Sequence, residues 1–199
     1  MSQLSQHLDT CDQTAGRRIT YGRQANDRVV KCVVEHAPSI RFDCFKEEDV
    51  ITFVDTSWGT RPIQCALVVA FGSYISGRVT KIEAATLSTC EAEWYGATMG
   101  TTMLMALGPV FDFLGIKPSK PSLIFCDNKS ACMLSNSNHS TKRMRHVAIR
   151  LAFLQEQVDN QVVRLVHIGT TGNVADIGTK PLPAQRFHDL AAILWTTEV

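Results

Sequence analysis

Short apolar runs separated by turn residues fill the chain from residue 50 to residue 82, a pattern that predicts β-strands joined by tight turns. β-Branched and aromatic residues occupy 50–54, and further apolar runs cover 63–71 and 74–82. The connections are short and contain the turn residues of 58–62 and Gly72. Three strands joined in this way predict an antiparallel meander.

The hydrophobic period then changes from that of a strand to that of an α-helix. Ser88 is a favourable N-cap, and Glu91 follows three residues later, which is the spacing of a capping box. Apolar residues recur through 94–107 and give the helix a broad apolar face. The Gly-Pro pair at 108–109 predicts a break or kink, and Gly115 lies where the continuation should end.

The second half of the chain alternates strand and helix patterns. Predicted strands cover 122–126 and 161–168, and predicted helices cover 128–134, 145–158 and 184–195. Such alternation predicts parallel pairing with right-handed crossovers. We therefore expect an α/β fold with a five-stranded mixed sheet, three antiparallel strands followed by two parallel ones, flanked by helices. Residues 1–45 are polar and weakly periodic, and we expect them to be an appended segment ahead of a domain at 46–199.

The composition changes this picture little, because it is that of an ordinary globular protein. Hydrophobic residues make up 45% of the chain, charged residues 20%, and the net charge is +1. A balanced charge gives no general support for nucleic-acid binding, which must then depend on local clusters. The seven cysteines form no Cys-x-x-Cys pair, which argues against structural zinc and favours reduced thiols in an intracellular protein. The longest apolar run, 65–71, is too short to span a bilayer, so we expect no membrane partner.

Four carboxylates stand where side chains from different elements can meet. Asp55 and Asp127 follow predicted strands, Glu93 lies in the first turns of the long predicted helix, and Asp176 opens a helical segment after the last strand. Ligands in such sheets bind at the carboxyl ends of strands, and clustered carboxylates resist burial without a cation. The four acids therefore predict a site for Mg²⁺, and two such ions can promote hydrolysis of a phosphodiester. Taken singly, each acid can also be a helix cap or a solvated surface group.

The segments around these acids resemble the RNase H domain of copia-type LTR retrotransposon Pol polyproteins, over about 50–195. The matching segments, in chain order, are Phe53-Val54-Asp55-Thr56-Ser57-Trp58, Leu87-Ser88-Thr89-Cys90-Glu91-Ala92-Glu93-Trp94, Ile124-Phe125-Cys126-Asp127-Asn128-Lys129-Ser130-Ala131, Thr141-Lys142-Arg143-Met144-Arg145-His146-Val147-Ala148-Ile149-Arg150 and Ala175-Asp176-Ile177-Gly178-Thr179-Lys180-Pro181-Leu182-Pro183. The resemblance implies an RNase H-like fold and an endonuclease that hydrolyses the RNA strand of RNA–DNA hybrids with two Mg²⁺ or Mn²⁺ ions.

The same resemblance implies roles and partners. It assigns Asp55, Glu93, Asp127 and Asp176 as the catalytic metal ligands, with Asp55 bridging both ions. Residues 1–45 look like the end of a reverse transcriptase and its connection, so the expected partners are an RNA–DNA hybrid and the reverse transcriptase portion of the same polyprotein. Met1 would then lie inside a longer polyprotein. The expected location is cytoplasmic, in a virus-like particle, with the nucleus as a second location.

A dense basic cluster precedes and enters the helix predicted at 145–158. It consists of Lys142, Arg143, Arg145, His146 and Arg150. Contact with the phosphates of a hybrid is one interpretation, and a solvated helix face is the other. Cations at a helix N-terminus oppose the helix dipole, which favours the functional interpretation.

Two further residues have both a functional and a structural interpretation. Asn128 follows Asp127 and is a candidate for contact with the 2′-hydroxyl groups of RNA, or else for capping the next helix. His167 ends a predicted strand and is a candidate for proton transfer, although a histidine in this place is more often structural.

The chain departs from the family pattern in three places. Thr56 and Ser57 replace an acid and an alanine, the motif expected after the third strand is absent around 76–78, and Gly178 replaces a larger residue. A catalytically inactive retrotransposon remnant, or a module that binds hybrid or is only structural, is therefore the alternative. An integrase- or transposase-type nuclease on the same fold is a rival that Glu93 argues against.

Overall fold

The structure is a computed structural model that describes residues 49–70, 73–137 and 148–195. The appended segment predicted at 1–45 and the basic residues Lys142, Arg143, Arg145 and His146 lie outside the described residues. Predictions made for those positions stay predictions.

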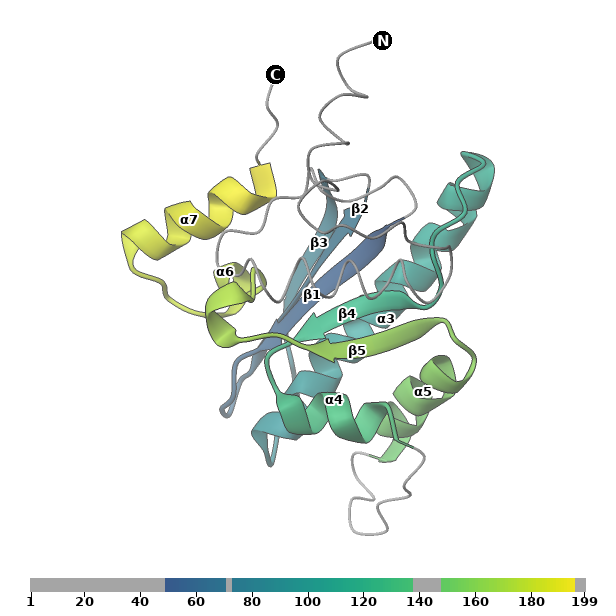
Figure 1. The fold of residues 1–199 in the computed structure, drawn as a ribbon. Helices are drawn as coiled ribbons and strands as arrows, with labels where there is room; N and C mark the ends of the chain where they lie inside the picture. Colours follow the sequence, from purple (N-terminus) through teal and green to yellow (C-terminus); the bar gives the residue numbers. More distant parts are fainter. Residues whose placement is uncertain (1–48, 71–72, 138–147, 196–199) are drawn as a thin grey trace, which may run out of the picture.

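A five-stranded mixed sheet forms the centre of the molecule (Figure 1). Its strands are β1 (Val50–Thr56), β2 (Ile63–Ala70), β3 (Ser73–Lys81), β4 (Ser122–Cys126) and β5 (Val163–His167). Their order is β3-β2-β1-β4-β5, with antiparallel pairing among the first three in sequence and parallel pairing of β1 with β4 and of β4 with β5. The predicted fold class is confirmed, and β1 and β4 lie side by side with their carboxyl ends at the same edge.

Helices cover both faces of the sheet (Figure 1). They are α3 (Thr89–Phe113), α4 (Lys129–Ser135), α5 (Ala148–Asp159), the 3₁₀ turn η2 (Thr170–Gly172), α6 (Asp176–Thr179) and α7 (Ala184–Trp195). One core, which includes Trp94 and Leu154, packs α3, α4 and α5 against the first face. A second core, which includes Val174 and Leu190, packs the segment around α6 and α7 against the other. Side chains that alternate along β1 therefore reach opposite layers of the fold.

The N-terminus of α3 is built as its sequence predicts. Ser88 Oγ accepts a hydrogen bond from the Glu91 backbone N–H at 3.1 Å, and Glu91 Oε2 accepts one from the Leu87 N–H at 2.7 Å. Gly96 and Gly100 let the helix lie close to β1, because a Cβ at Gly96 would stand 2.7 Å from Thr56 Oγ1. The cap and this close approach hold the first turns of α3, and with them Glu93, against the carboxyl end of β1.

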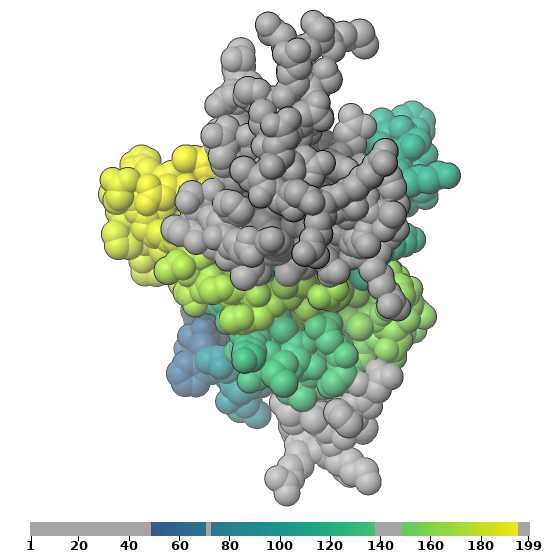
Figure 2. All heavy atoms as spheres, in the orientation of Figure 1, coloured from purple at the N-terminus to yellow at the C-terminus, as the bar shows by residue number. Residues whose placement is uncertain are grey.

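Of the break or kink expected at Gly108-Pro109, the break is wrong. The helix continues through Pro109 to Phe113, since this stretch is largely exposed and water can hydrogen-bond the carbonyl that loses its partner. Gly115, at φ 71°, ends the helix, and the N–H groups of Gly115 and Ile116 donate to Asp112 and Phe111, as in a Schellman motif. In the orientation of Figure 1, this end of α3 projects on the right flank and α7 forms the left flank (Figure 2).

The turn between β5 and α6 is tied to the central strand by a buried amide. Asn173 is fully buried, its Nδ2 donates to the Val54 carbonyl at 2.9 Å, and its Oδ1 accepts from the Ala175 N–H at 3.2 Å. These bonds fix the start of α6, and so Asp176, relative to β1. Among the described residues, no helix is both long enough and apolar enough to cross a membrane.

Candidate metal centre

Three of the four predicted acids come together at the carboxyl edge of β1 and β4. Asp55 is the second-last residue of β1, Asp127 follows β4 directly, and Asp176 is the first residue of α6. One carboxylate oxygen from each lies within 4.8 Å of the others. Asp55 and Asp176 are 1% and 4% exposed, which is rare for carboxylates that lack a compensating positive charge.

Glu93 approaches the same edge from α3, on the other side of β1 and β4. A ligand atom of Glu93 lies within 4.8 Å of Asp127 and of the Cys126 sulfur, and Glu93 Oε2 accepts a hydrogen bond from Cys126 Sγ at 3.5 Å. Burial, followed by the neighbouring Cys126, Asp55 and Asp127, raises the pKa of Glu93 to about 11. In the absence of a cation, this carboxyl group is therefore held protonated at neutral pH.

Two hydroxyl groups orient the acids. Thr179 Oγ1 donates a short hydrogen bond to Asp55 Oδ2, and Thr170 Oγ1 donates to Asp127 Oδ2 at 3.1 Å. Thr170 lies in η2 and Thr179 in α6, so both belong to the part of the chain after β5. This part of the chain therefore orients Asp55 and Asp127, which come from earlier strands. Partners of this kind hold carboxylates in defined orientations and raise the precision of a metal site.

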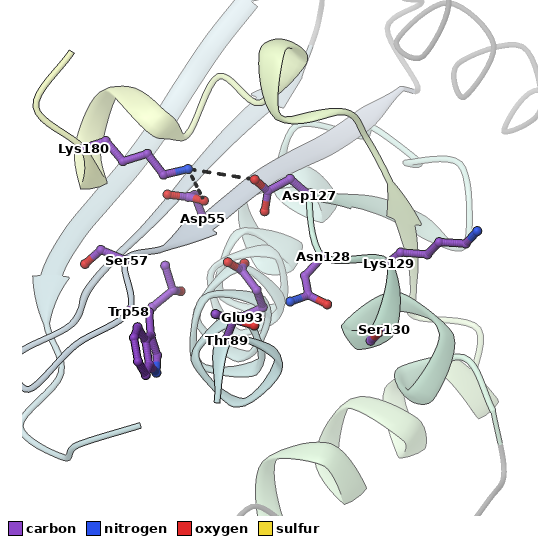
Figure 3. A pocket seen from close by; sticks show the side chains of 11 residues that line it. Asp55, Ser57, Trp58, Thr89, Glu93, Asp127, Asn128, Lys129, Ser130 and Lys180 are labelled. Atoms are coloured by element: carbon purple, nitrogen blue, oxygen red, sulfur yellow. Dashed lines mark hydrogen bonds and ion pairs between the residues drawn. The ribbon is translucent and has the colours of Figure 1, made fainter. Parts of the chain in front are cut away.

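The ammonium group of Lys180 lies among the three aspartates, and Figure 3 shows its contacts with Asp55 and Asp127. Lys180 Nζ is 2.6 Å from Asp176 Oδ1, 3.2 Å from Asp55 Oδ1 and 3.9 Å from Asp127 Oδ2. Burial alone would lower the pKa of Lys180, but the hydrogen bond to Asp176 and the charges of all three aspartates raise it above its usual range. The cluster therefore attracts and holds a positive charge.

An open cavity of about 430 Å³ leads to this cluster. Asp55, Glu93, Asp127 and Lys180 form its floor, while Trp58 stands at one side and Asn128, Lys129 and Ser130 at the other (Figure 3). The Trp58 side chain is 64% exposed. The acids are thus accessible to a large substrate from a mouth that offers an aromatic ring, an amide and a cation.

The donor set fits a hard divalent cation such as Mg²⁺ or Mn²⁺. Its members are carboxylate oxygens from four elements, which is the ligand type these ions prefer. The Cys126 sulfur lies beside Glu93 and Asp127, and a hydrogen bond with Cys132 and burial raise the pKa of its thiol well above the usual range. Without a metal the thiol form is favoured, so the carboxylate oxygens of the four acids are the main ligands that the site offers.

The other residues predicted to belong to the site differ in their surroundings. Asn128 lines the cavity, but its Oδ1 also caps α4 by accepting from the Ala131 N–H at 3.0 Å, as the structural interpretation expected. His167 is exposed at the end of β5, in register with Cys126. Arg150 lies in α5, where its guanidinium stacks 3.7 Å from the centre of the Tyr95 ring.

Sequence reasoning missed Lys180, Thr179, Thr170 and Trp58 as parts of the site. Thr179, Lys180 and Trp58 lie inside the segments that resemble the family, within four residues of Asp176 or Asp55. That position was the signal that could have identified them. Lys180 also stands four residues after Asp176, which places both side chains on one helical turn. Thr170 gives no comparable signal, since it lies 43 residues from the aspartate that it contacts.

Gly178, where the family pattern has a larger residue, packs against β2 and β3 with no room for a side chain. A Cβ at this position would lie 2.6 Å from Cys65 Sγ and 2.8 Å from Val79 Cγ2.

We expect Gly178→Leu to lower the free energy of unfolding by about 1–3 kcal/mol, because the added atoms push α6 away from the sheet. Denaturant unfolding measures this change. Gly108→Leu is the matched control, since a Cβ at Gly108 meets no atom within 4 Å, and equal stability of both variants would contradict the expectation.

Comparison with known proteins gives relatives among retrotransposon polyproteins. No protein-family model matches the sequence. The chain is 32% identical over 112 residues to the retrovirus-related Pol polyprotein from transposon RE1 of Arabidopsis thaliana, covering 56% of this chain and 8% of the polyprotein. It is 31% identical over 117 residues to the Pol polyprotein from transposon TNT 1-94 of Nicotiana tabacum, covering 59% of this chain and 9% of that protein. The chain thus spans less than a tenth of the length of these relatives.

Solved structures with the same arrangement are RNase H domains. RNase H1 from the halophilic archaeon Halobacterium salinarum NRC-1 superposes with a TM-score of 0.53 at 15% identity, covering 66% of this chain and 94% of that one. LC11-RNase H1, solved in complex with an RNA/DNA hybrid, gives a TM-score of 0.50 at 12% identity and covers 66% and 94% of the two chains. At such identities the comparison establishes the fold, and the expectation of an RNase H-like fold is confirmed.

Proposed function

We propose that this chain, a relative of retrotransposon Pol polyproteins with the RNase H fold, is a metal-dependent endonuclease that hydrolyses the RNA strand of RNA–DNA hybrids. The observation that carries the proposal is the convergence of Asp55, Asp127 and Asp176 within 4.8 Å, with Glu93 beside Asp127. Asp55, Glu93 and Asp127 line an open cavity. Clustered carboxylates resist burial without a compensating positive charge, and the single ammonium group of Lys180 is shared by three of these acids, which favours a further cation at the site.

Asp55, Glu93, Asp127 and Asp176 would hold two Mg²⁺ or Mn²⁺ ions. Such ions, when bound, lower the pKa of an attacking water and stabilise the leaving oxygen at phosphorus. The chain's own contribution is orientation: Thr179 and Thr170 fix the carboxylates of Asp55 and Asp127. His167, at the end of β5, is proposed to accept or release protons near the site.

A hybrid duplex is the proposed substrate for two reasons. LC11-RNase H1, which shares the fold, is solved in complex with an RNA/DNA hybrid. The Asn128 amide also lies in the cavity wall beside Asp127, where it can contact a ribose 2′-hydroxyl group and so distinguish RNA from DNA. The proposed partner within the polyprotein is the reverse transcriptase portion, which makes such hybrids. Lys142, Arg143, Arg145 and His146 are proposed to contact phosphates.

A panel of end-labelled substrates tests the proposal. The purified chain is incubated with an RNA–DNA hybrid, single-stranded RNA, single-stranded DNA and duplex DNA, each with Mg²⁺ or Mn²⁺. The proposal predicts internal cleavage of the RNA strand of the hybrid and little cleavage of the other substrates. Cleavage of DNA would favour an integrase- or transposase-type nuclease. No cleavage by a folded protein that still binds hybrid would favour the inactive remnant.

Trp58 is expected to contribute to hybrid binding. Its ring is largely exposed beside the acids (Figure 3). Stacking of an aromatic ring on a single-stranded base contributes about 1–3 kcal/mol, and we expect the lower part of this range for packing against a sugar of the hybrid. Trp58→Ala should therefore raise KM for the hybrid by roughly tenfold with a much smaller change in kcat, whereas Trp58→Phe should stay near the wild type. Steady-state kinetics measure both parameters, and an unchanged KM for Trp58→Ala would exclude this contact.

A further inference from the structure

Lys180 is not needed to complete the donor set, yet its ammonium group occupies the space between the acids. Its Nζ lies within 4 Å of a carboxylate oxygen of Asp55, Asp127 and Asp176. A divalent ion bound by the same three aspartates would have to lie among the same oxygens, so the lysine and an ion there repel each other and compete for ligands. Both cannot keep these contacts at once.

The lysine is also able to leave. Its side chain is 36% exposed, whereas those of Asp55 and Asp176 are 1% and 5% exposed. Lys180 is the C-cap residue of α6, directly before Pro181, and its side chain extends along the cavity that opens to solvent. Rotation of its side-chain torsions would move the ammonium into this cavity without any change in α6 or β1. The aspartates have no such freedom.

We propose that Lys180 is a built-in counter-ion, which neutralises the aspartates while the site is free of metal and is displaced when a divalent cation binds. The inference rests on the proposed metal site. In this role Lys180 is a positioning residue. Its ammonium group holds Asp55, Asp127 and Asp176 together before the ion arrives, and the same charge weakens the binding of the ion. The wild-type chain therefore binds metal less tightly than a chain without this charge, and its metal-free form is more stable.

Mn²⁺ titration by calorimetry tests the competition directly. Lys180→Met keeps much of the side chain's volume and removes its charge, so we expect Mn²⁺ to bind about tenfold more tightly, while the midpoint of metal-free unfolding falls. Lys180→Arg keeps the charge and should restore metal-free stability with an affinity near that of the wild type. Lys129→Met is the matched control: it removes an exposed charge at the cavity mouth, directed away from the acids in Figure 3, and should change Mn²⁺ affinity by less than about twofold.

A second measurement uses the unaltered chain. Reductive methylation followed by mass spectrometry reports how readily each lysine amine reacts, and ion pairing with carboxylates suppresses the reaction. We expect Mn²⁺ to increase the labelling of Lys180 several-fold and to leave that of Lys129 unchanged. Labelling of Lys180 that stays constant or falls with Mn²⁺, or Lys180→Met that binds Mn²⁺ no more tightly than the wild type, would overturn the inference.

The outcome is separable from that of the nuclease proposal. A wild-type chain that leaves the hybrid intact, with Mn²⁺ affinity still raised in Lys180→Met, would remove the proposed activity and keep the role of Lys180. Conversely, metal-dependent cleavage of the hybrid with unchanged Mn²⁺ affinity in Lys180→Met would retain the nuclease and reject the counter-ion.

Discussion

Asp55→Asn is expected to lower the rate of hybrid cleavage by roughly 10³-fold, because it removes a negative charge from the point where the other acids converge. Metal ions supply several kcal/mol of transition-state stabilisation in such reactions, and about 4 kcal/mol corresponds to a factor near 10³. Asp55 lies in the central strand of the sheet, 1% exposed, and is contacted by both Thr179 and Lys180. Asparagine has nearly the same shape and accepts the same hydrogen bond from Thr179, so the fold should persist.

The experiment compares single-turnover rates of Asp55→Asn and wild type in saturating Mg²⁺, with circular dichroism as the check on folding. Asp159→Asn, at the exposed end of α5, is the matched control for removing one carboxylate charge and should cleave at the wild-type rate. A folded Asp55→Asn protein that retains more than about a tenth of the wild-type rate would show that the centre of the site has been assigned wrongly.

Glu93→Gln should make the metal-free protein more stable, although it removes a proposed metal ligand. Burial raises the pKa of Glu93 to about 11 in the folded chain, whereas an unfolded glutamate ionises near pH 4.3. The folded state thus holds a proton that the unfolded state releases. When folding raises the pKa of a group, the contribution of that group to the free energy of unfolding is fully present below the unfolded-state pKa. It is lost as the pH rises toward the folded-state pKa. Glutamine is neutral in both states and has no such loss.

The difference between the two proteins is therefore pH-dependent in a defined direction. At pH 8 the metal-free Glu93→Gln variant should be more stable by roughly 5 kcal/mol, and the gain should shrink toward pH 5. Urea unfolding at several pH values in the presence of a chelator measures it. Mg²⁺ should narrow or reverse this difference, because it stabilises the wild type more than a variant that keeps only the three aspartates as acidic ligands. A variant that is less stable than the wild type at pH 8 would contradict the protonated state inferred for Glu93.

Much of the fold follows from local pattern. The strand at Ser122–Cys126 and the helix at Ala184–Trp195 have the predicted bounds, because each is a periodic run bounded by turn residues. The Ser88–Glu91 cap and the positions of Asp127 and Asp176 beside element ends were also predictable. These features depend on residues within a few positions of one another.

The contacts that complete the site depend on distant parts of the chain and were not predictable in this way. Asn173 bonds Val54 across 119 positions, and Thr179 bonds Asp55 across 124. Lys180 lies among the aspartates because α6 packs close to β1. Local sequence patterns do not show how closely these two elements approach each other. The continuation of α3 through Pro109 was missed because propensity alone does not show that this end of the helix is exposed.

The departures from the family pattern do not disturb the acids among the described residues. Thr56 is buried against α3, where the absence of a side chain at Gly96 leaves room for it. Ser57 closes the turn after β1, since its Oγ accepts from the Ile63 N–H at 2.8 Å. Gly178 allows α6 to lie against Cys65. Ser57 and Gly178 therefore have local structural roles, and none of the three residues displaces an acid.

Cleavage of an RNA–DNA hybrid by the wild-type chain, with label on each strand in turn, is the decisive measurement and is made in Mg²⁺, in Mn²⁺ and in chelator. A metal-dependent nuclease specific for the RNA strand of hybrids makes internal cuts in that strand alone, in either metal, and none in chelator. Intact RNA in both metals from a folded chain that binds Mn²⁺, or cleavage that persists in chelator, would contradict the proposed activity.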